Sequence, residues 1–234
     1  MNIDKIKQLA SAYLDEVRSI RRHLHAHPEL SFEEFKTSQF IASKLREFGI
    51  PFREGVVKTG IIAHIEGKDP ASATIALRAD MDALPIEEKN NTEYCSANKG
   101  VMHACGHDVH TASLLGAAKI LVQLRNEFSG TVKLIFQPGE EKLPGGASLM
   151  IKEGALKDPV PAGIIAQHVF PSLETGKVGF RSGMYMASTD ELYLTVKGKG
   201  GHAAMPSDYN NPIFIASEIL LELNRQFMNE NSIL

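Results

Sequence analysis

The sequence of 234 residues has only two cysteines, no excess of charge of one sign and no long uninterrupted hydrophobic run. Cys95 and Cys105 allow at most one disulfide, so a disulfide-dense scaffold is excluded. With 25 Lys and Arg against 28 Asp and Glu, the net charge is -3, which is too small to attract phosphate backbones or anionic lipid. We therefore expect neither nucleic acid nor membrane among the partners.

The first twenty residues, MNIDKIKQLASAYLDEVRSI, mix charged and apolar side chains. This pattern lacks the apolar stretch of an export signal and of a membrane span. We expect a cytoplasmic protein, in which a reducing environment keeps both cysteines as thiols. The sequence also has no repeat of 20 to 50 residues and no low-complexity tract, which excludes solenoids and tails.

What the sequence does contain is 43% hydrophobic residues, enough for one sizeable core and a smaller appendage. Apolar residues spaced three and four apart predict a helix from Ile3 to about His25. Ser31 and Glu34 have the form of a capping box that opens a second helix, and Gly49 supplies its stop.

Short runs rich in β-branched residues follow, and they predict strands at 60–65, 74–77, 131–136 and 163–166. Between the second and third runs, residues 111–124 have the composition of a buried helix. Strands that alternate with helices predict an α/β domain with a central, largely parallel sheet flanked by helices.

The pattern changes from about Ala187, and we expect one domain over 1–186 and the first part of another domain over 187–234. Residues 191–198 alternate like a half-exposed strand, a glycine-rich loop follows, and 213–227 has helical spacing. One strand and one helix bury little surface alone, so this second domain is expected to be incomplete or completed by a partner.

The segment MHACGHDVH, residues 102–110, packs a thiol and three imidazoles just before a helix. Cys105 and His107 are separated by one glycine and can turn toward one point. A thiolate with an imidazole suits zinc, cobalt, manganese or nickel better than magnesium or calcium. The alternative is a loop of surface histidines beside a buried free cysteine.

Two adjacent acids, Glu140 and Glu141, follow the strand TVKLIF. Neighbouring side chains diverge, so one carboxylate can bind a metal while the other acts as a general base on metal-bound water. The alternative is a solvated turn with two exposed glutamates.

Asp80 and His168 also follow predicted strands. Ligands gather outside the carboxyl ends of parallel strands, so these residues predict a hydrolytic site with one or two metal ions. Alternatively, His168 is a hydrogen-bonded core histidine, and Asp80 caps a helix or pairs with Arg78.

The loop GKGGHAAMP, residues 198–206, matches a loose dinucleotide-binding pattern. Pro206 and Pro212 prevent the immediate helix that would hold a pyrophosphate, so we rank a nucleotide-binding module below the other hypotheses. Over a metal site, His202 could donate a hydrogen bond to a developing oxyanion. The alternative is a glycine-rich surface turn.

Six runs together resemble the M20 metallopeptidase family: HAHPELSFEE, LRADMDALPI, MHACGHDVHTA, FQPGEE, AQHVFP and KGKGGHAAMP. More narrowly, they are similar to its amidohydrolase branch, which contains hippurate hydrolases, N-acyl-amino-acid amidohydrolases and N-acetyldiaminopimelate deacetylases. The resemblance implies a catalytic α/β domain with a metal centre, and an α+β lid domain that dimerises and begins near Ala187.

The resemblance also implies roles for single residues. Glu140 matches the general base, Asp80 an active-site aspartate, and His202 a lid histidine that contacts substrate. The positions that match metal ligands are Cys105, His107, Glu141 and His168. Arg78 stands where other branches place a metal-binding histidine. Gly139 replaces an alanine of many relatives, a change that we expect to be harmless.

Members of this family continue for a further stretch that completes the lid and adds another histidine ligand, so we expect this chain to be incomplete and poorly active alone. The main hypothesis is a metal-dependent amidohydrolase that cleaves N-acetyl or N-benzoyl amino acids as a homodimer. It would use one or two ions of zinc, manganese, cobalt or nickel. The alternative is a catalytically impaired metal-binding fragment that acts only by association.

Overall fold

The computed structural model describes residues 2–186 and 191–229. The chain divides into two compact units, Met1–Thr175 and Gly176–Leu234. The domain boundary expected after residue 186 borders residues 187–190, which lie outside the described residues.

The first unit alternates helices and strands as the sequence predicts. Its elements are α1 (Ile3–Ala26), α2 (Phe35–Glu47), β1 (Phe52–Val56), β2 (Gly60–Glu66), β3 (Thr74–Asp80), α3 (His107–Gln123), β4 (Thr131–Gln137), α4 (Gly146–Lys152) and β5 (Gly163–Ala166). A 3-10 turn, Arg125–Glu127, separates α3 from β4. The α/β class is confirmed.

The five strands form one mixed sheet in the order β1-β2-β4-β3-β5. β3 pairs in parallel with both β4 and β5, whereas β2 runs antiparallel to β4 and β1 antiparallel to β2. The parallel pairing places Asp80 opposite Gln137, so β3 and β4 end at the same edge of the sheet. This shared edge positions the candidate site.

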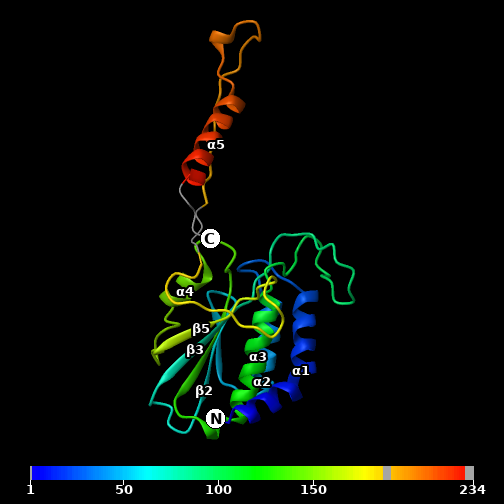
Figure 1. Cartoon of the computed structure of the whole chain (residues 1–234), viewed down its shortest axis with the longest axis vertical. Helices are drawn as coiled ribbons and strands as arrows, with labels where there is room; N and C mark the ends of the chain where they lie inside the picture. The colour runs from blue at the N-terminus through cyan, green and yellow to red at the C-terminus, as the bar shows by residue number, and fades with distance from the viewer. Residues whose placement is uncertain (1, 187–190, 230–234) are drawn as a thin grey trace. The chain divides into compact units, whose positions relative to one another are not determined.

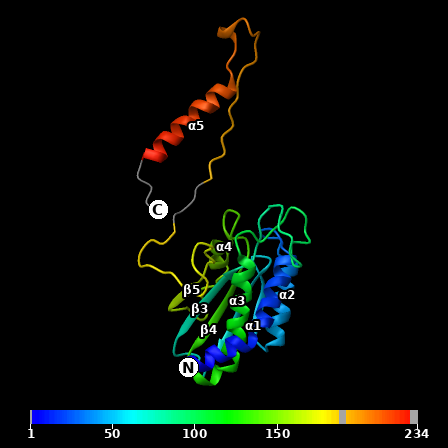
Figure 2. The ribbon, with the colours of Figure 1, turned by 45° about the vertical axis from the view of Figure 1, so that its right-hand side comes forward.

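Three helices, α1, α2 and α3, cover one face of the sheet (Figures 1 and 2). Their apolar sides bury Leu24, Leu45 and Leu115 against Ile61 and Phe136 of the sheet. Full burial of such a side chain stabilises the folded state by about 1.5–3 kcal/mol. The core explains the C-terminal part of the stripe that begins at Ile3, since Ile20 and Leu24 are buried. Ile3 and Leu14 of the same stripe are exposed.

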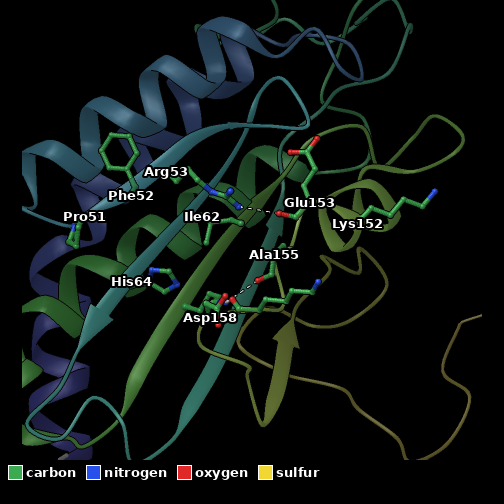
Figure 3. Close-up of a pocket in the computed structure, with 12 residues that line it drawn as sticks. Pro51, Phe52, Arg53, Ile62, His64, Lys152, Glu153, Ala155 and Asp158 are labelled. Atoms are coloured by element: carbon green, nitrogen blue, oxygen red, sulfur yellow. Dashed lines mark hydrogen bonds between the residues drawn. The ribbon is translucent and has the colours of Figure 1, made fainter.

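The opposite face packs α4 against Ile62, Ala76 and Ile135. Beside this smaller core, the buried ammonium of Lys133 donates hydrogen bonds to the carbonyl oxygens of three residues: Ala155, Lys157 and Pro159. Lys133 also lines an open pocket of about 640 Å³, and Figure 3 shows Arg53 and Glu153 at the rim of this pocket. None of the candidate site residues lines this pocket.

The predicted capping box at the start of α2 is wrong. The Glu34 side chain is fully buried and does not cap the helix. It accepts hydrogen bonds from Phe32 N, Thr59 Oγ1 and Gly139 N, because burial in the fold offers it donors from distant segments. The Ser31 hydroxyl donates to Asp82 instead. The stop at Gly49 is confirmed, with α2 ending at Glu47 and Gly49 at a φ of +68°.

In the second unit, residues 206–208 form a 3-10 turn and α5 spans Pro212–Asn229, which confirms the predicted helix. The strand predicted over 191–198 is wrong, because that segment finds no neighbouring strand among the described residues. A single bridge between Lys199 and Asn210 follows it. Of the helices in the described ranges, none has the length and apolar character that crossing a bilayer requires.

Candidate metal centre

The carboxyl ends of β3, β4 and β5 bring the predicted acids and one histidine to a common edge. Asp80 is the last residue of β3, Glu140 and Glu141 lie just beyond β4, and His168 lies two residues beyond β5. These strands are parallel, so segments distant in sequence converge there.

The fourth segment is the loop that enters α3. Gly106 adopts a φ of +92°, and a Cβ there would lie 2.4 Å from Cγ2 of Val169. Glycine therefore lets the loop turn closely past the residue after His168. The turn leaves Cys105 half-buried and makes His107 the first residue of α3, with its side chain 1% exposed.

The predicted metal-binding side chains approach one another in overlapping groups. Cys105 Sγ lies 3.3 Å from His168 Nε2, and both belong with His107 to a group whose ligand atoms are within 4.8 Å of one another. His107, Glu140 and Glu141 form a second such group. His107 Nε2 lies 3.7 Å from Glu141 Oε1 and 4.0 Å from Glu140 Oε2. His107 joins the two groups.

Two buried polar atoms at the centre have no hydrogen-bond partner in the described part of the chain: His107 Nε2 and Glu141 Oε1. An unsatisfied buried acceptor costs about 1–3 kcal/mol, and more when it is charged. A cation between these atoms would satisfy both. The donor set of thiolate, imidazole and carboxylate is one that zinc and other transition metals accept. The residues therefore fit a metal ion.

In the metal-free centre, the surroundings of Cys105 disfavour its thiolate form. Burial raises the pKa of Cys105 to about 12, and the neighbouring Glu141 carboxylate adds to the shift. Burial and the charge of Glu141 also raise the pKa of Glu140 above its ordinary value. A metal ligand must be deprotonated, so binding at Cys105 would release the thiol proton.

Asp80 is held as an anion by its neighbours. It accepts hydrogen bonds from Arg78 Nη1 at 2.7 Å and from His110 Nδ1 at 2.6 Å. Burial alone would raise the pKa of Asp80, but the hydrogen bond from His110 and the charge of Arg78 outweigh it and lower the pKa to about 2. The alternative pairing of Asp80 with Arg78 is thus confirmed.

Asp82 and His110, for which the sequence predicts no role, contact residues of the centre. The Asp82 carboxylate contacts His107 Nδ1 at 3.2 Å and accepts a hydrogen bond from Glu141 N at 3.0 Å. His110 Nε2 accepts a hydrogen bond from Val169 N at 3.0 Å, next to His168. Their presence in the runs LRADMDALPI and MHACGHDVHTA was the only signal for them in the sequence.

Several alternatives from the sequence do not match the structure. His107 and His110 are buried rather than on the surface, and Cys105 is half-buried. His168 is exposed and is not a core histidine. At Gly139 a Cβ would lie 2.4 Å from the Phe32 ring at a φ of +57°, so glycine suits this position.

His202 belongs to the second unit and is exposed. Its Nδ1 accepts a hydrogen bond from Ala204 N at 3.2 Å, within the glycine-rich loop. No helix begins directly after Gly201 in this described segment, which agrees with the exclusion of a dinucleotide site. Its contact with substrate stays a prediction.

The parallel strand ends and the mixed donor set define an α/β protein of the metal-binding class. The chain belongs to the peptidase family M20/M25/M40, whose family model matches residues 76–228. This family membership agrees with the resemblance seen in the sequence motifs.

Individual relatives have related names. The chain is 45% identical over 223 residues to the N-acyl-L-amino acid amidohydrolase of Geobacillus stearothermophilus, a match that covers 95% of this chain and 60% of that protein. It is 48% identical over 204 residues to the N-acetyl-L-cysteine deacetylase of Bacillus subtilis, covering 87% of this chain and 48% of the relative.

A solved structure of a member of the M20 family is also similar to this chain. The Bacillus subtilis YXEP protein, described as a dinuclear metal-binding peptidase from the M20 family, matches with a TM-score of 0.70 and 43% identity. That match covers 74% of this chain and 48% of the YXEP chain. The chain thus spans about half to three fifths of the length of these relatives.

Proposed function

We propose that this chain carries the metal centre of a metal-dependent amidohydrolase that cleaves the amide bond of N-acyl amino acids. The observation that carries the proposal is the pair of unsatisfied buried atoms, His107 Nε2 and Glu141 Oε1, beside the Cys105 and His168 donors. The substrate class is supported by the relatives, whose names specify N-acyl-L-amino acids and N-acetyl-L-cysteine.

In this proposal, four side chains bind one or two divalent ions of zinc, manganese, cobalt or nickel. They are Cys105, His107, Glu141 and His168. The bound metal would polarise the substrate carbonyl and lower the pKa of a coordinated water. The name of the YXEP relative supports a site with two ions.

Glu140 would act as the general base. Its carboxylate is exposed enough to meet substrate and water, with 42% side-chain exposure, yet lies 4.0 Å from His107 Nε2. Its raised pKa brings the proton affinity nearer to that of a base that works close to neutral pH. Glu140 would take a proton from water and return it to the leaving amine.

Asp80 would complete the reacting centre as a permanent anion, since its Oδ2 lies 3.7 Å from His107 Nε2. His202 would donate a hydrogen bond to the oxyanion that develops on the substrate carbonyl. We further propose that residues 187–234 belong to a lid that dimerises, after a metal-binding domain over 1–186. A cytoplasmic location is also proposed, supported by the two free cysteines.

The experiment is to load the purified chain with each of the four metals and to measure bound metal and release of amino acid from N-acetyl and N-benzoyl substrates. The proposal expects bound metal and metal-dependent hydrolysis. Bound metal without hydrolysis would favour the alternative, a metal-binding protein that acts by association. A chain that binds none of the metals would contradict both.

A further inference from the structure

The face of the sheet that packs α4 also forms the pocket of about 640 Å³ that Lys133 lines. Strands β1, β2 and β4 supply one wall, and the segment that follows α4 supplies another. Arg53 of β1 pairs with Ile62 of β2, and His64 of β2 pairs with Lys133 of β4. Directly paired residues of antiparallel strands point to the same face, so these four side chains gather on one side of the sheet.

Basic side chains outnumber acidic ones in this pocket. The acidic residues are Glu153 and Asp158, and the basic ones are Arg53, Lys133, Lys152 and Lys157. Glu153 is partly engaged elsewhere, because its Oε2 accepts a hydrogen bond from Val57 N at 3.0 Å. A concave surface with an excess of positive charge focuses the electric field and attracts anions.

Lys133 contributes a buried positive charge to one wall of the pocket. The residue is 1% exposed, and the partners of its ammonium in the described part of the chain are three backbone carbonyl oxygens rather than a carboxylate. Burial lowers the pKa of Lys133, the charge of Asp158 opposes this effect, and the charge of Arg53 adds to it. A buried charge without a counterion is costly, and an anion in the adjoining pocket would supply the counterion.

The Arg53 guanidinium has N–H groups available to a ligand. Its hydrogen bond among the described residues joins Nη2 to the carbonyl oxygen of Glu153 at 3.5 Å, which is long for such a contact. Figure 3 shows the side chains of Arg53, Ile62 and His64 along one side of the pocket, whereas that of Lys152 points away from them. The planar guanidinium binds carboxylate and phosphate oxygens through paired N–H groups.

We propose that this pocket is a binding site for a small phosphate ester, separate from the metal centre. A phosphate ester carries a charge of about −1.5 to −2 and three acceptor oxygens, which matches the excess of basic side chains. Arg53 and the exposed Lys157 would bind these oxygens. The pocket is larger than phosphate alone and lies within the range of small-molecule sites, about 300–1,000 Å³, so the organic part would lie against Pro51 and Ile62.

The test is calorimetric titration of glycerol 3-phosphate into the metal-free chain. We expect Arg53→Gln to weaken binding about 10-fold or more, because hydrogen bonds to a charged group are lost. Both Arg53 and Lys152 are exposed, so substitutions at either position should leave the fold intact.

Lys152→Gln is the matched control. It removes a positive charge from the same pocket, but its side chain points away from Arg53, so the affinity should stay within about threefold of wild type. Equal losses in the two variants would overturn the proposal, because binding would then follow overall charge rather than a defined site. A wild-type chain that does not bind the ester would overturn it as well.

Two further titrations identify the ligand group and its place. Succinate carries two negative charges on separate carboxylates, and binding as tight as that of glycerol 3-phosphate would contradict the phosphate assignment. Cys105→Ser changes the candidate metal centre and does not touch this pocket, so its affinity for the ester should equal that of wild type. Loss of binding in Cys105→Ser would place the ester at the metal centre and overturn the proposal.

This inference goes beyond the proposed function and does not depend on it. A chain that binds glycerol 3-phosphate but none of the four metals supports the inference and contradicts the proposed function. A chain that binds metal but not the ester contradicts the inference alone.

His64 allows a second measurement that needs no variant. It lines the pocket, and its Nε2 is buried without a hydrogen-bond partner among the described residues. Burial and the charge of Lys133 lower the pKa of His64, Glu66 opposes them, and Arg53 lowers it further. A bound dianion would offset the charges of Lys133 and Arg53. We therefore expect NMR titration of the His64 ring to show a higher pKa at saturating glycerol 3-phosphate, and an unchanged pKa would overturn the proposal.

Discussion

The ring of Phe32 fills the space that a Cβ atom on residue 139 would occupy, with ring atoms 2.4 Å from the ideal Cβ position. Gly139 also has a φ of +57°, which side chains other than glycine adopt at a cost. This pair lies directly before Glu140, the proposed base. The packing and backbone of this chain thus favour glycine at position 139.

We expect Gly139→Ala to lower the free energy of unfolding by about 2–4 kcal/mol, from overpacking against Phe32 added to backbone strain. Urea denaturation measures the change. The control is Gly49→Ala, at a φ of +68° with nothing within 4 Å, for which only the strain of about 1 kcal/mol is expected. Equal losses in the two variants would show that Phe32 does not restrict this position.

The general-base assignment predicts different results for the two adjacent glutamates. Glu140→Gln should retain bound metal while hydrolysis falls by about 10²–10⁴-fold, because the amide cannot accept a proton. Glu141→Gln should lose metal, since its buried Oε1 faces His107 Nε2. Metal content and turnover are measured on both proteins. Undiminished hydrolysis by Glu140→Gln would refute the role assigned to Glu140.

The buried ammonium of Lys133 satisfies three carbonyl oxygens in the segment that follows α4. Lys133→Met fills similar space but leaves these acceptors without their donor, so we expect a loss of about 2–4 kcal/mol in unfolding free energy. The exposed Lys152 of α4 offers a control, and Lys152→Met should stay within about 0.5 kcal/mol of wild type. A small effect at Lys133 would mean that water replaces the ammonium.

His25 predicts a pH dependence of stability. Its Nδ1 lies 2.7 Å from Asp108 Oδ2 and 3.3 Å from Arg21, and its Nε2 lies 3.2 Å from Glu88. The hydrogen bond with Asp108 raises the pKa of His25 against the opposing effects of burial and Arg21. A raised folded-state pKa adds stability that is complete below the unfolded pKa, about 6.5, and is lost as pH rises through the folded value.

The stability difference between wild type and His25→Gln should therefore be larger near about pH 6 than near about pH 9. Denaturant unfolding at both values measures it. In an Asp108→Asn background the same substitution should show a weaker dependence on pH, because the partner that raises the pKa is gone. A difference that grows with rising pH would contradict the sign of this argument.

Much of the fold could be predicted because its signals are local. The spacing of apolar residues predicts α1, and β-branched runs predict β2 to β5. β1 was missed because Arg53, Glu54 and Gly55 break the pattern, and its middle residues are exposed. The strand expected over 191–198 failed because alternation does not supply a hydrogen-bonded neighbour.

The site was predictable to the extent that strand ends determine positions. Asp80, Glu141 and His168 reach one edge because their strands are parallel. The roles of Glu34 and Asp82 could not be predicted, since each binds segments far away in sequence. A capping-box pattern at Ser31 is local, but the tertiary contact with Asp82 takes precedence over it.

The most direct test is a crystal structure of the zinc-loaded chain in which anomalous scattering locates the metal. We expect an ion about 2.3 Å from sulfur and about 2.0–2.2 Å from nitrogen or oxygen ligands. Those ligands, around one ion or a close pair of ions, would be Cys105, His107, Glu141 and His168. An ion bound elsewhere, with these four side chains directed to separate places, would contradict it.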